Sequence, residues 1–274
     1  MKARWMLALV AAMVSTEPCR AAERSIVLAS TTSLEASGLL ANILPQFTAT
    51  TGIIVNVVAQ GTGKALDTAR RGDADLLLVH DPEAEQQFMD EAQGSTRRQI
   101  AWNDFVVVGP SADPAHIRGS HDSVAALGAI ASAQAPFVSR GDRSGTNAME
   151  LRLWKMAGKT PDVLNNETWY RDVGGGMGQA LNAASTMDAY TLSDRGTWLS
   201  FNNKASLVIA VEGDPRLINR YDVIELNPQK HPNANLAGAK TLAAWLTSPE
   251  GQQAIGAYQV NGQKPFNPSA ASPK

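Results

Sequence analysis

The chain has 274 residues, 44% of them apolar and 18% charged, and a formal net charge of −2. A chain of this size and composition is expected to be globular and is long enough to divide into two lobes. Its charge balance offers no basic field, which excludes a nucleic-acid-binding protein. It contains one cysteine, which excludes an internal disulfide and argues against a structural zinc site.

The N-terminus has the layout of a secretory signal peptide. A basic start precedes an apolar run over residues 5–14 and a small-residue stretch at 19–22. The run is too short to anchor the chain in a bilayer. A lipoprotein attached through Cys19 is the alternative, but the Glu-Pro pair before it lacks the residues of a lipid-attachment motif. We therefore predict a signal peptide over 1–22 and a periplasmic mature chain.

The next segment alternates apolar strands with amphipathic helices. Strands are predicted over 25–29, 53–59 and 75–79, and helices over 34–47 and 65–70. Pro45 is expected to kink the first helix, because proline lacks the N–H of an interior helical position. This order predicts a parallel sheet with helices on both faces, in which ligands bind at the carboxyl ends of the strands.

The remainder of the chain continues the pattern. Strands are expected over 103–109, 135–138, 167–173, 205–211 and 221–226, and helices over 123–133, between 144 and 158, after 174–178, over 237–246 and from 248. The runs at 103–109 and 205–211 are long enough to cross between lobes. We therefore expect two doubly wound α/β lobes joined by two hinge crossings, with the ligand in the cleft: lobe I over 23–105 plus 207–274, and lobe II over 106–206.

A strand end, a tight loop and a helix start meet at residues 138–146. Ser144 or Thr146 can cap this helix, whose first turn presents unpaired N–H donors and a partial positive charge. Arg140 adds a permanent cation with forked donors that suit a tetrahedral oxyanion. The segment indicates an oxyanion site. The alternative is a simple capped helix with Arg140 paired to Asp142 on the surface.

Other loops could complete such a site. Residues 30–33 carry four consecutive hydroxyls, although Thr32 and Glu35 also match a capping box that would need only one of them. Residues 61–64 (GTGK) lack the full phosphate-loop pattern, so we expect their glycines to turn backbone N–H groups toward the cleft. The glycine run at 174–178 either supplies a fourth wall or is a flexible loop before a helix.

Enzymatic alternatives have weaker support. The four histidines lack metal-ligand spacing, and the chain has no Gly-x-Ser-x-Gly motif. A serine hydrolase would need Ser144 to meet one of the histidines in space. We predict no catalytic residue, no cofactor and no metal site.

With these loops identified, the sequence resembles the solute-binding proteins of tungstate ABC transporters over nearly the whole mature chain. The segments that carry the resemblance are 29–33 (ASTTS), 61–66 (GTGKAL), 72–80 (GDADLLLVH), 103–110 (NDFVVVGP), 139–146 (SRGDRSGT), 190–197 (YTLSDRGT) and 211–216 (VEGDPR). The family's first loop is threonine-rich, and here Ser30 stands in its leading place without loss of a donor.

The resemblance implies a type II periplasmic binding-protein fold that closes on tungstate, with molybdate as competitor, and that delivers it to a membrane permease with its ATPase. By position it implies that the loop at 31–33, Arg140 and Thr146 contact the ligand. We expect a monomer. The full set of candidate oxyanion-binding residues is Thr31, Thr32, Ser33, Thr62, Gly63, Arg140, Ser144, Gly145, Thr146 and Gly178.

Phosphate and sulfate are the alternative ligands, because the loop from Arg140 to Thr146 also resembles one of phosphate-binding proteins. Near neutral pH phosphate keeps a proton and needs an acceptor in its site, whereas tungstate, molybdate and sulfate need donors only. The loops at 30–33 and 61–64 contain no carboxylate, and Asp142 is the one acid near Arg140. The sequence therefore favours a donor-only oxyanion.

Overall fold

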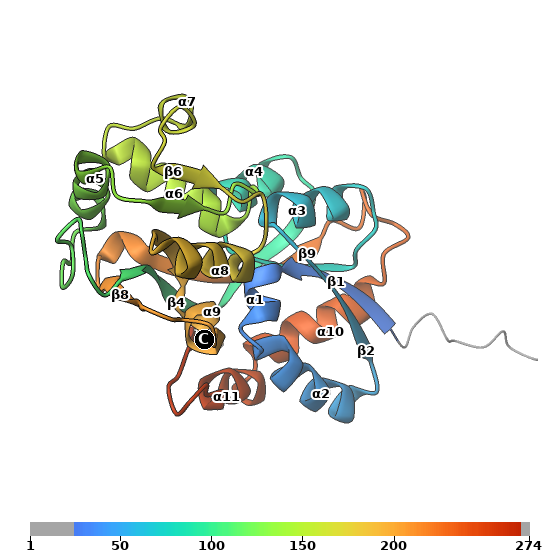
Figure 1. The fold of residues 1–274 in the computed structure, drawn as a ribbon. Helices are drawn as coiled ribbons and strands as arrows, with labels where there is room; N and C mark the ends of the chain where they lie inside the picture. The colour runs from blue at the N-terminus through green and yellow to red at the C-terminus, as the bar shows by residue number, and fades with distance from the viewer. Residues whose placement is uncertain (1–24, 270–274) are drawn as a thin grey trace, which may run out of the picture.

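Residues 25–269 are described by this computed structural model, and they form two sheets with helices packed around them (Figure 1). The strands are β1 (Ser25–Thr31), β2 (Ile54–Gln60), β3 (Leu76–Val79), β4 (Gly94–Pro110), β5 (Phe137–Ser139), β6 (Tyr170–Asp172), β7 (Tyr190–Asp194), β8 (Leu207–Val211), β9 (Ile218–Leu226) and β10 (Asn267–Pro268). The helices are α1 (Thr32–Ala36), α2 (Leu39–Thr51), α3 (Thr62–Arg70), α4 (Pro82–Asp90), α5 (Ser123–Ala133), α6 (Gly145–Met156), α7 (Pro161–Leu164), α8 (Met177–Met187), α9 (Arg195–Ser200), α10 (Leu236–Thr247), α11 (Pro249–Ala257) and the 3-10 turn η2 (Pro215–Leu217). The predicted signal peptide over 1–22 lies outside the described residues.

The first sheet has the strand order β2-β1-β3-β9-β4, with β10 added to β4. Strands β1, β2 and β3 are parallel, as predicted, whereas β9 and β4 run antiparallel to their neighbours. In the second sheet β4 pairs with β7 and β8, and β5 lies parallel between β7 and β6. The carboxyl ends of β1, β3, β5 and β7 lead directly into Thr32, His80, Arg140 and Arg195.

Strand β4 joins the two sheets. Its residues up to Asp104 pair with β9 in the first sheet, and those from Phe105 onward pair with β7 and β8 in the second. This confirms the first predicted crossing, at 103–109. The chain returns at the start of β9, where Ile218 pairs with Asp104.

The second crossing was predicted in the wrong place. The run at 205–211 forms β8, which pairs with the second part of β4, and Leu207 and Leu217 pack in the cores of the second sheet. Residues 207–217 therefore lie with 106–206 and not with the first sheet. An apolar strand is buried equally well in either sheet, so its composition could not distinguish a crossing from a further sheet strand.

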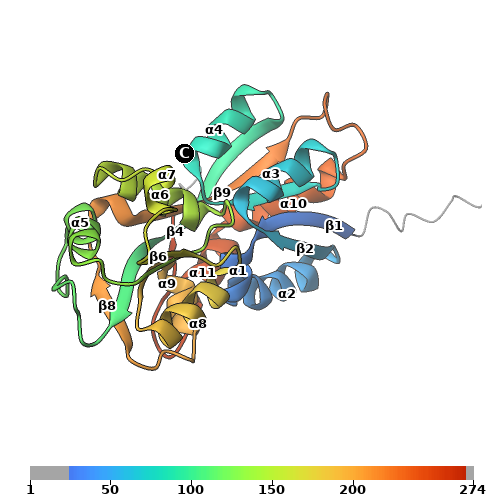
Figure 2. The ribbon, with the colours of Figure 1, turned by 45° about the horizontal axis from the view of Figure 1, so that its top comes forward.

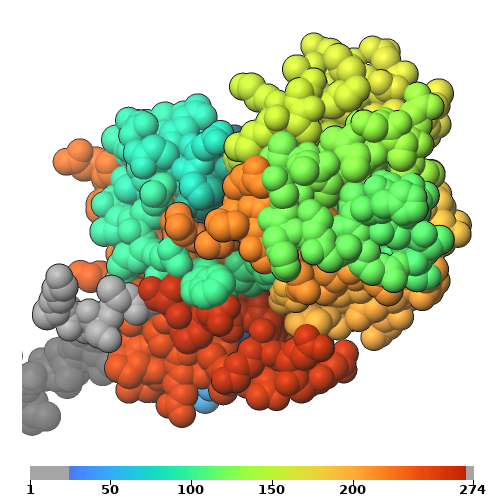
Figure 3. All heavy atoms as spheres, turned by 90° about the vertical axis from the view of Figure 1, so that its left-hand side faces the viewer, coloured from blue at the N-terminus to red at the C-terminus, as the bar shows by residue number. Residues whose placement is uncertain are grey.

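Helices cover both faces of each sheet, which gives four hydrophobic cores (Figures 1 and 2). In the first sheet α2, α10 and α11 pack on one face and α3 and α4 on the other. In the second sheet α5 and α6 pack on one face and α8 and α9 on the other. The first half (residues 25–104 and 218–269) and the second half (residues 105–217) therefore each have their own cores. Figure 3 shows green and yellow segments of the second half abutting teal and red segments of the first.

The first helix is interrupted at a different residue from the one expected. Helix α1 ends at Ala36 and α2 begins at Leu39, with Gly38 between them at φ +80°. Helix α2 continues through Pro45. A positive φ is easily adopted only by glycine, so Gly38 is where the chain can turn between the two helices.

Candidate functional site

Arg140 follows β5 directly and is almost fully buried, with 1% of its surface exposed. Its Nη2 donates to Thr32 Oγ1 at 3.0 Å and to Asp142 Oδ2 at 2.6 Å, and its Nη1 lies 3.5 Å from Thr146 Oγ1. Thr32 belongs to the first half, so Arg140 links the halves. Its Nε has no hydrogen-bond partner within residues 25–269. Most buried donors in folded proteins have a hydrogen-bond partner, so the unpaired Arg140 Nε is unusual.

The start of α6 faces the first half of the molecule. Ser144 is the N-cap, since its Oγ accepts from the Asn147 amide at 3.2 Å. Gly145 and Thr146 open the helix, so their amides have no intrahelical acceptor. A Cβ on Gly145 would lie 2.7 Å from the His80 carbonyl oxygen, so only glycine allows this approach. Helix α6 thus brings its positive N-terminal end to the contact between the two halves, which is called the junction below.

The GTGK loop packs against the Arg140 loop from the other side. A Cβ on Gly61 would lie 3.2 Å from the Asp142 carbonyl oxygen and 3.4 Å from the Ser144 nitrogen. Gly61 caps α3 without a side chain, and Gly63 is the second residue of that helix. The buried Thr62 Oγ1 has no hydrogen-bond partner in the described part of the chain. Two helix N-termini, one from each half, therefore meet here with an unused hydroxyl.

In the hydroxyl loop, Thr31 rather than Thr32 is the N-cap of α1, because its Oγ1 accepts from the Leu34 amide at 3.4 Å. Thr31 Oγ1 and Ser33 Oγ are 3.2 Å apart, and Ser33 Oγ lies 2.9 Å from His80 Nε2. Both hydroxyls therefore have protein partners. The structure directs Thr32 to Arg140, which the capping-box expectation had not anticipated.

His80 is held between Ser33 and Asn219. The Asn219 amide nitrogen donates to Asn103 and to the Tyr221 hydroxyl, so its oxygen, 3.0 Å from His80 Nδ1, is an acceptor. This network assigns the proton of His80 to Nδ1 and leaves Nε2 to accept from the Ser33 hydroxyl. Burial and the charge of the nearby Arg140 lower the pKa of His80 to about 4. The ring is neutral at physiological pH.

Ser33, His80 and Asn219 have the spacing of a nucleophile, a base and an orienting group, but they lack its chemistry. A histidine with a pKa of about 4 is a weak general base at neutral pH, and Ser33 is 1% exposed. The hydroxyl of Ser144, the serine expected in a hydrolase, caps α6 instead. Within residues 25–269 no cluster of His, Cys, Asp and Glu could hold a metal ion.

The glycine run is attached to the Arg140 loop. The Gly175 amide donates to the Arg140 carbonyl at 3.1 Å, and the Gly176 amide donates to Gln179 Oε1 at 3.0 Å. Gly178 is the second residue of α8, which contacts α1 of the first half. The loop therefore bounds the junction on a further side.

Two buried carboxyl groups near the loop were not identified from the sequence. Asp194 ends β7 and caps α9, its Oδ1 accepting from the Thr197 amide at 2.8 Å, while its Oδ2 is buried without a hydrogen-bond partner in residues 25–269. Glu150 on α6 accepts from Ser139 at 2.8 Å and from Tyr170 at 2.7 Å, and burial raises the pKa of Glu150 to about 7. A strand-end aspartate and an interior helical glutamate carried no signal beyond capping and amphipathicity.

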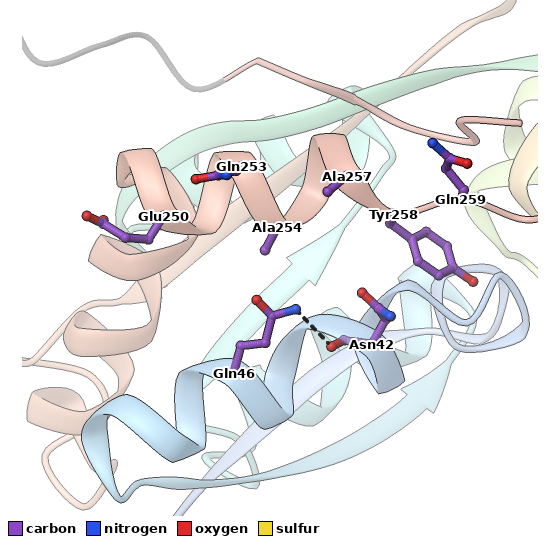
Figure 4. Close-up of a pocket in the computed structure, with 8 residues that line it drawn as sticks. All are labelled: Asn42, Gln46, Glu250, Gln253, Ala254, Ala257, Tyr258 and Gln259. Atoms are coloured by element: carbon purple, nitrogen blue, oxygen red, sulfur yellow. Dashed lines mark hydrogen bonds between the residues drawn. The ribbon is translucent and has the colours of Figure 1, made fainter. Parts of the chain in front are cut away.

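Two surface cavities lie away from these residues. One of about 420 Å³ lies between α2 and α11 and is lined by neutral amides, Glu250 and Tyr258 (Figure 4). Another, of about 450 Å³, separates α4 from α6, near the ion pair of Arg152 with Asp81 at 3.0 Å. Neither cavity is lined by any of the candidate residues. The candidate residues described above lie instead where the two halves meet.

Comparison with known proteins places the chain among binding proteins. Residues 16–250 match the family model of a PBP superfamily domain. The tungstate-binding protein TupA of Peptoclostridium acidaminophilum is 44% identical over 254 residues, which cover 91% of this chain and 87% of the relative. The structure of the tungstate binding protein TupA from Desulfovibrio alaskensis G20 is 42% identical, with a TM-score of 0.77 and coverage of 90% of this chain and 99% of that one. The tungstate ABC transporter structure from Geobacter sulfurreducens is 40% identical, with a TM-score of 0.78 and coverage of 86% and 99%.

Two sheets joined by β4 and β9, with donor loops meeting between them, define a type II periplasmic binding-protein fold. The chain passes between the halves within β4, as predicted, and again at the start of β9, where the sequence had not placed the second crossing. The chain belongs to the PBP superfamily and, within it, to the family of the tungstate-binding proteins TupA. This confirms the fold class and the family resemblance inferred from the sequence.

Proposed function

We propose that the protein is an extracytoplasmic solute-binding protein that captures tungstate and delivers it to an ABC transporter permease. The observation that carries the proposal is the buried Arg140, whose Nε has no partner in residues 25–269, at a junction where the N-termini of α3 and α6 meet. Oxyanions are bound by this combination of guanidinium and helix N-termini. The names of the relatives and of the similar structures supply the ligand.

Both halves provide donors, so binding and closure are linked. The first half contributes Thr32, Thr62 and the start of α3, and the second contributes Arg140 and the start of α6. We infer that the halves rotate about the crossings in β4 and at the start of β9, and that the anion joins them when they close. The hydroxyls of Thr31 and Ser33 already have protein partners, so we infer that this loop would donate to the anion mainly through the backbone amides at the start of α1.

The hydrogen bonds of Asp142 favour an anion without a proton. Asp142, the acid first considered as an acceptor for phosphate, has both oxygens engaged, Oδ2 by Arg140 at 2.6 Å and Oδ1 by the Ser144 amide at 3.1 Å. Tungstate and molybdate present acceptors only and suit the donors that surround the junction. We propose tungstate as the primary ligand and molybdate as its competitor, with sulfate and phosphate as the anions to compare.

The remaining parts of the proposal concern export of the chain and its partners in transport. No described helix is long and apolar enough to cross a membrane, and we propose export to the periplasm by the peptide at 1–22. We propose a monomer that presents its loaded form to the permease, whose ATPase drives release. Catalysis, a resident metal and a cofactor have no part in this function.

Isothermal titration calorimetry tests the proposed function in tungstate binding. Mature protein freed of anion is titrated with tungstate, molybdate, sulfate and phosphate in a buffer without phosphate. We expect tungstate to bind in the nanomolar range, which corresponds to about −12 kcal/mol, with molybdate weaker and phosphate silent. Binding of phosphate alone, or of none of the four anions, would refute the proposal.

A further inference from the structure

Asp194 ends the strand next to the one that leads into Arg140. Strands β5 and β7 are parallel neighbours, with Phe137 opposite Tyr190 and Val138 opposite Thr191, so both end at the same edge of the sheet. Arg140 follows the first strand and Asp194 ends the second. The charge of Arg140 acts on Asp194 and favours its ionised form, whereas burial acts more strongly and raises the pKa of Asp194.

The first half packs against the residues that follow Asp194. Thr197 Oγ1 lies 3.4 Å from the Ser33 carbonyl, and a Cβ on Gly196 would lie 3.1 Å from Ser37 Cβ. Asp194 is therefore enclosed between the end of the second sheet and α1, with 0% of its surface exposed. Its Oδ1 caps α9, and its Oδ2 has no partner in the described part of the chain.

An unpaired carboxyl oxygen at an oxyanion site can be satisfied in two ways. An ionised Oδ2 needs a hydrogen-bond donor, which a protonated anion such as hydrogen phosphate could supply. A protonated Oδ2 is itself a donor and needs an acceptor, and each oxygen of tungstate is one. The protonation state of Asp194 and that of the ligand are thus complementary.

The charges around Asp194 decide whether its carboxyl group is protonated or ionised when a dianion is bound. Arg140 is already paired with Asp142, so this pair contributes no net charge. His80 is neutral, Tyr221 on β9 is a neutral phenol with a raised pKa, and Asp104 on β4 is paired with Arg195 at 2.6 Å. An ionised Asp194 would face the dianion without a compensating cation of its own, and like charges in a buried site repel strongly.

We propose that the protonation of Asp194 sets the anion specificity of this site. Its carboxyl group takes up one proton when a fully deprotonated oxyanion binds, and the resulting O–H donates a hydrogen bond to a ligand oxygen. In this closing step the proton passes from solvent to Oδ2 and no covalent bond of the anion changes. The inference rests on the proposed function, since it requires tungstate as ligand.

The experiment is tungstate titration calorimetry at pH 7.0 in two buffers that differ in ionisation enthalpy, followed by affinities from pH 7 to 9. We expect uptake of close to one proton and an affinity that falls by up to tenfold for each pH unit. Asp194→Asn, which keeps the cap on α9 and supplies an N–H in place of the O–H, should bind tungstate without proton uptake and independently of pH.

Glu150→Gln is the matched variant, because Glu150 is the other buried carboxyl near the loop with a raised pKa. Proton uptake should persist in it. Uptake that disappears in Glu150→Gln and persists in Asp194→Asn would overturn the assignment. Tungstate binding without proton uptake in the unmodified protein overturns the proposal without reference to any variant, and absence of tungstate binding overturns the proposed function instead.

Discussion

Replacing Arg140 with alanine tests the centre of the site. The side chain is buried and donates to Thr32 and Asp142, and its Nε is available to the ligand. One hydrogen bond between charged groups contributes about 1.5–3 kcal/mol, which corresponds to roughly a 10- to 150-fold loss of affinity. The substitution also leaves the Asp142 carboxylate, 12% exposed, without its cation beside an incoming anion. We therefore expect Arg140→Ala to weaken tungstate binding at least tenfold and to reduce discrimination against molybdate.

The assay is calorimetric titration with both anions, with thermal unfolding as the check on folding. Arg143→Ala is the matched control, since Arg143 lies three residues away in the same loop, has the same charge and is exposed. It should bind tungstate almost normally. The double variant Arg140→Ala with Asp142→Asn should recover part of the loss, because it removes the uncompensated carboxylate. Equal affinities for the unmodified protein and Arg140→Ala would refute the role assigned to Arg140.

Three further substitutions separate binding from stability. Thr62→Val should weaken tungstate binding by about tenfold without loss of thermal stability, because Thr62 Oγ1 is buried and unpaired in the described structure; a normal dissociation constant would exclude it as a ligand. Thr146→Val should weaken binding and leave the melting curve unchanged, and a normal affinity would count against Thr146. Burial and the neighbouring Asp222 raise the pKa of Glu85 from its ordinary value of 4.5 to about 9. Folded protein therefore holds a proton that unfolded protein releases, and stability falls as the pH rises between these two values. Glu85→Gln should therefore gain in relative stability from pH 5 to pH 9, measured by denaturant unfolding, and parallel curves would contradict this.

Local chemistry made the Arg140 loop predictable. A hydroxyl residue directly before an amphipathic run predicts a capped helix start. In the structure Ser144 is that cap, and α6 follows it. The predicted alternation of strand and helix was confirmed for β1, β2 and β3 because short crossovers force parallel neighbours. The surface pairing of Arg140 with Asp142 was only partly anticipated: the pair exists, but Arg140 is buried.

Features that depend on distant partners could not be predicted. The capping-box pattern favoured Thr32 as the cap, whereas Thr31 is the cap and Thr32 contacts Arg140, 108 residues away. The contact of Ser33 with His80 spans 47 residues, and that of His80 with Asn219 spans 139. Periodicity reports which residues are buried but not which segment buries them.

The unpaired atoms at the junction explain why an anion would favour the closed form. Thr62 Oγ1 belongs to the first half, and Arg140 Nε and Asp194 Oδ2 belong to the second, and all three are buried without hydrogen-bond partners in residues 25–269. A buried polar group without a partner costs about 1–3 kcal/mol, so closure around an empty site is opposed by groups from both halves. In the open form water would solvate them, and in the closed form an oxyanion would bond to them. The ligand thus supplies the difference in free energy between the two forms, which is the only way in which binding can drive a conformational change.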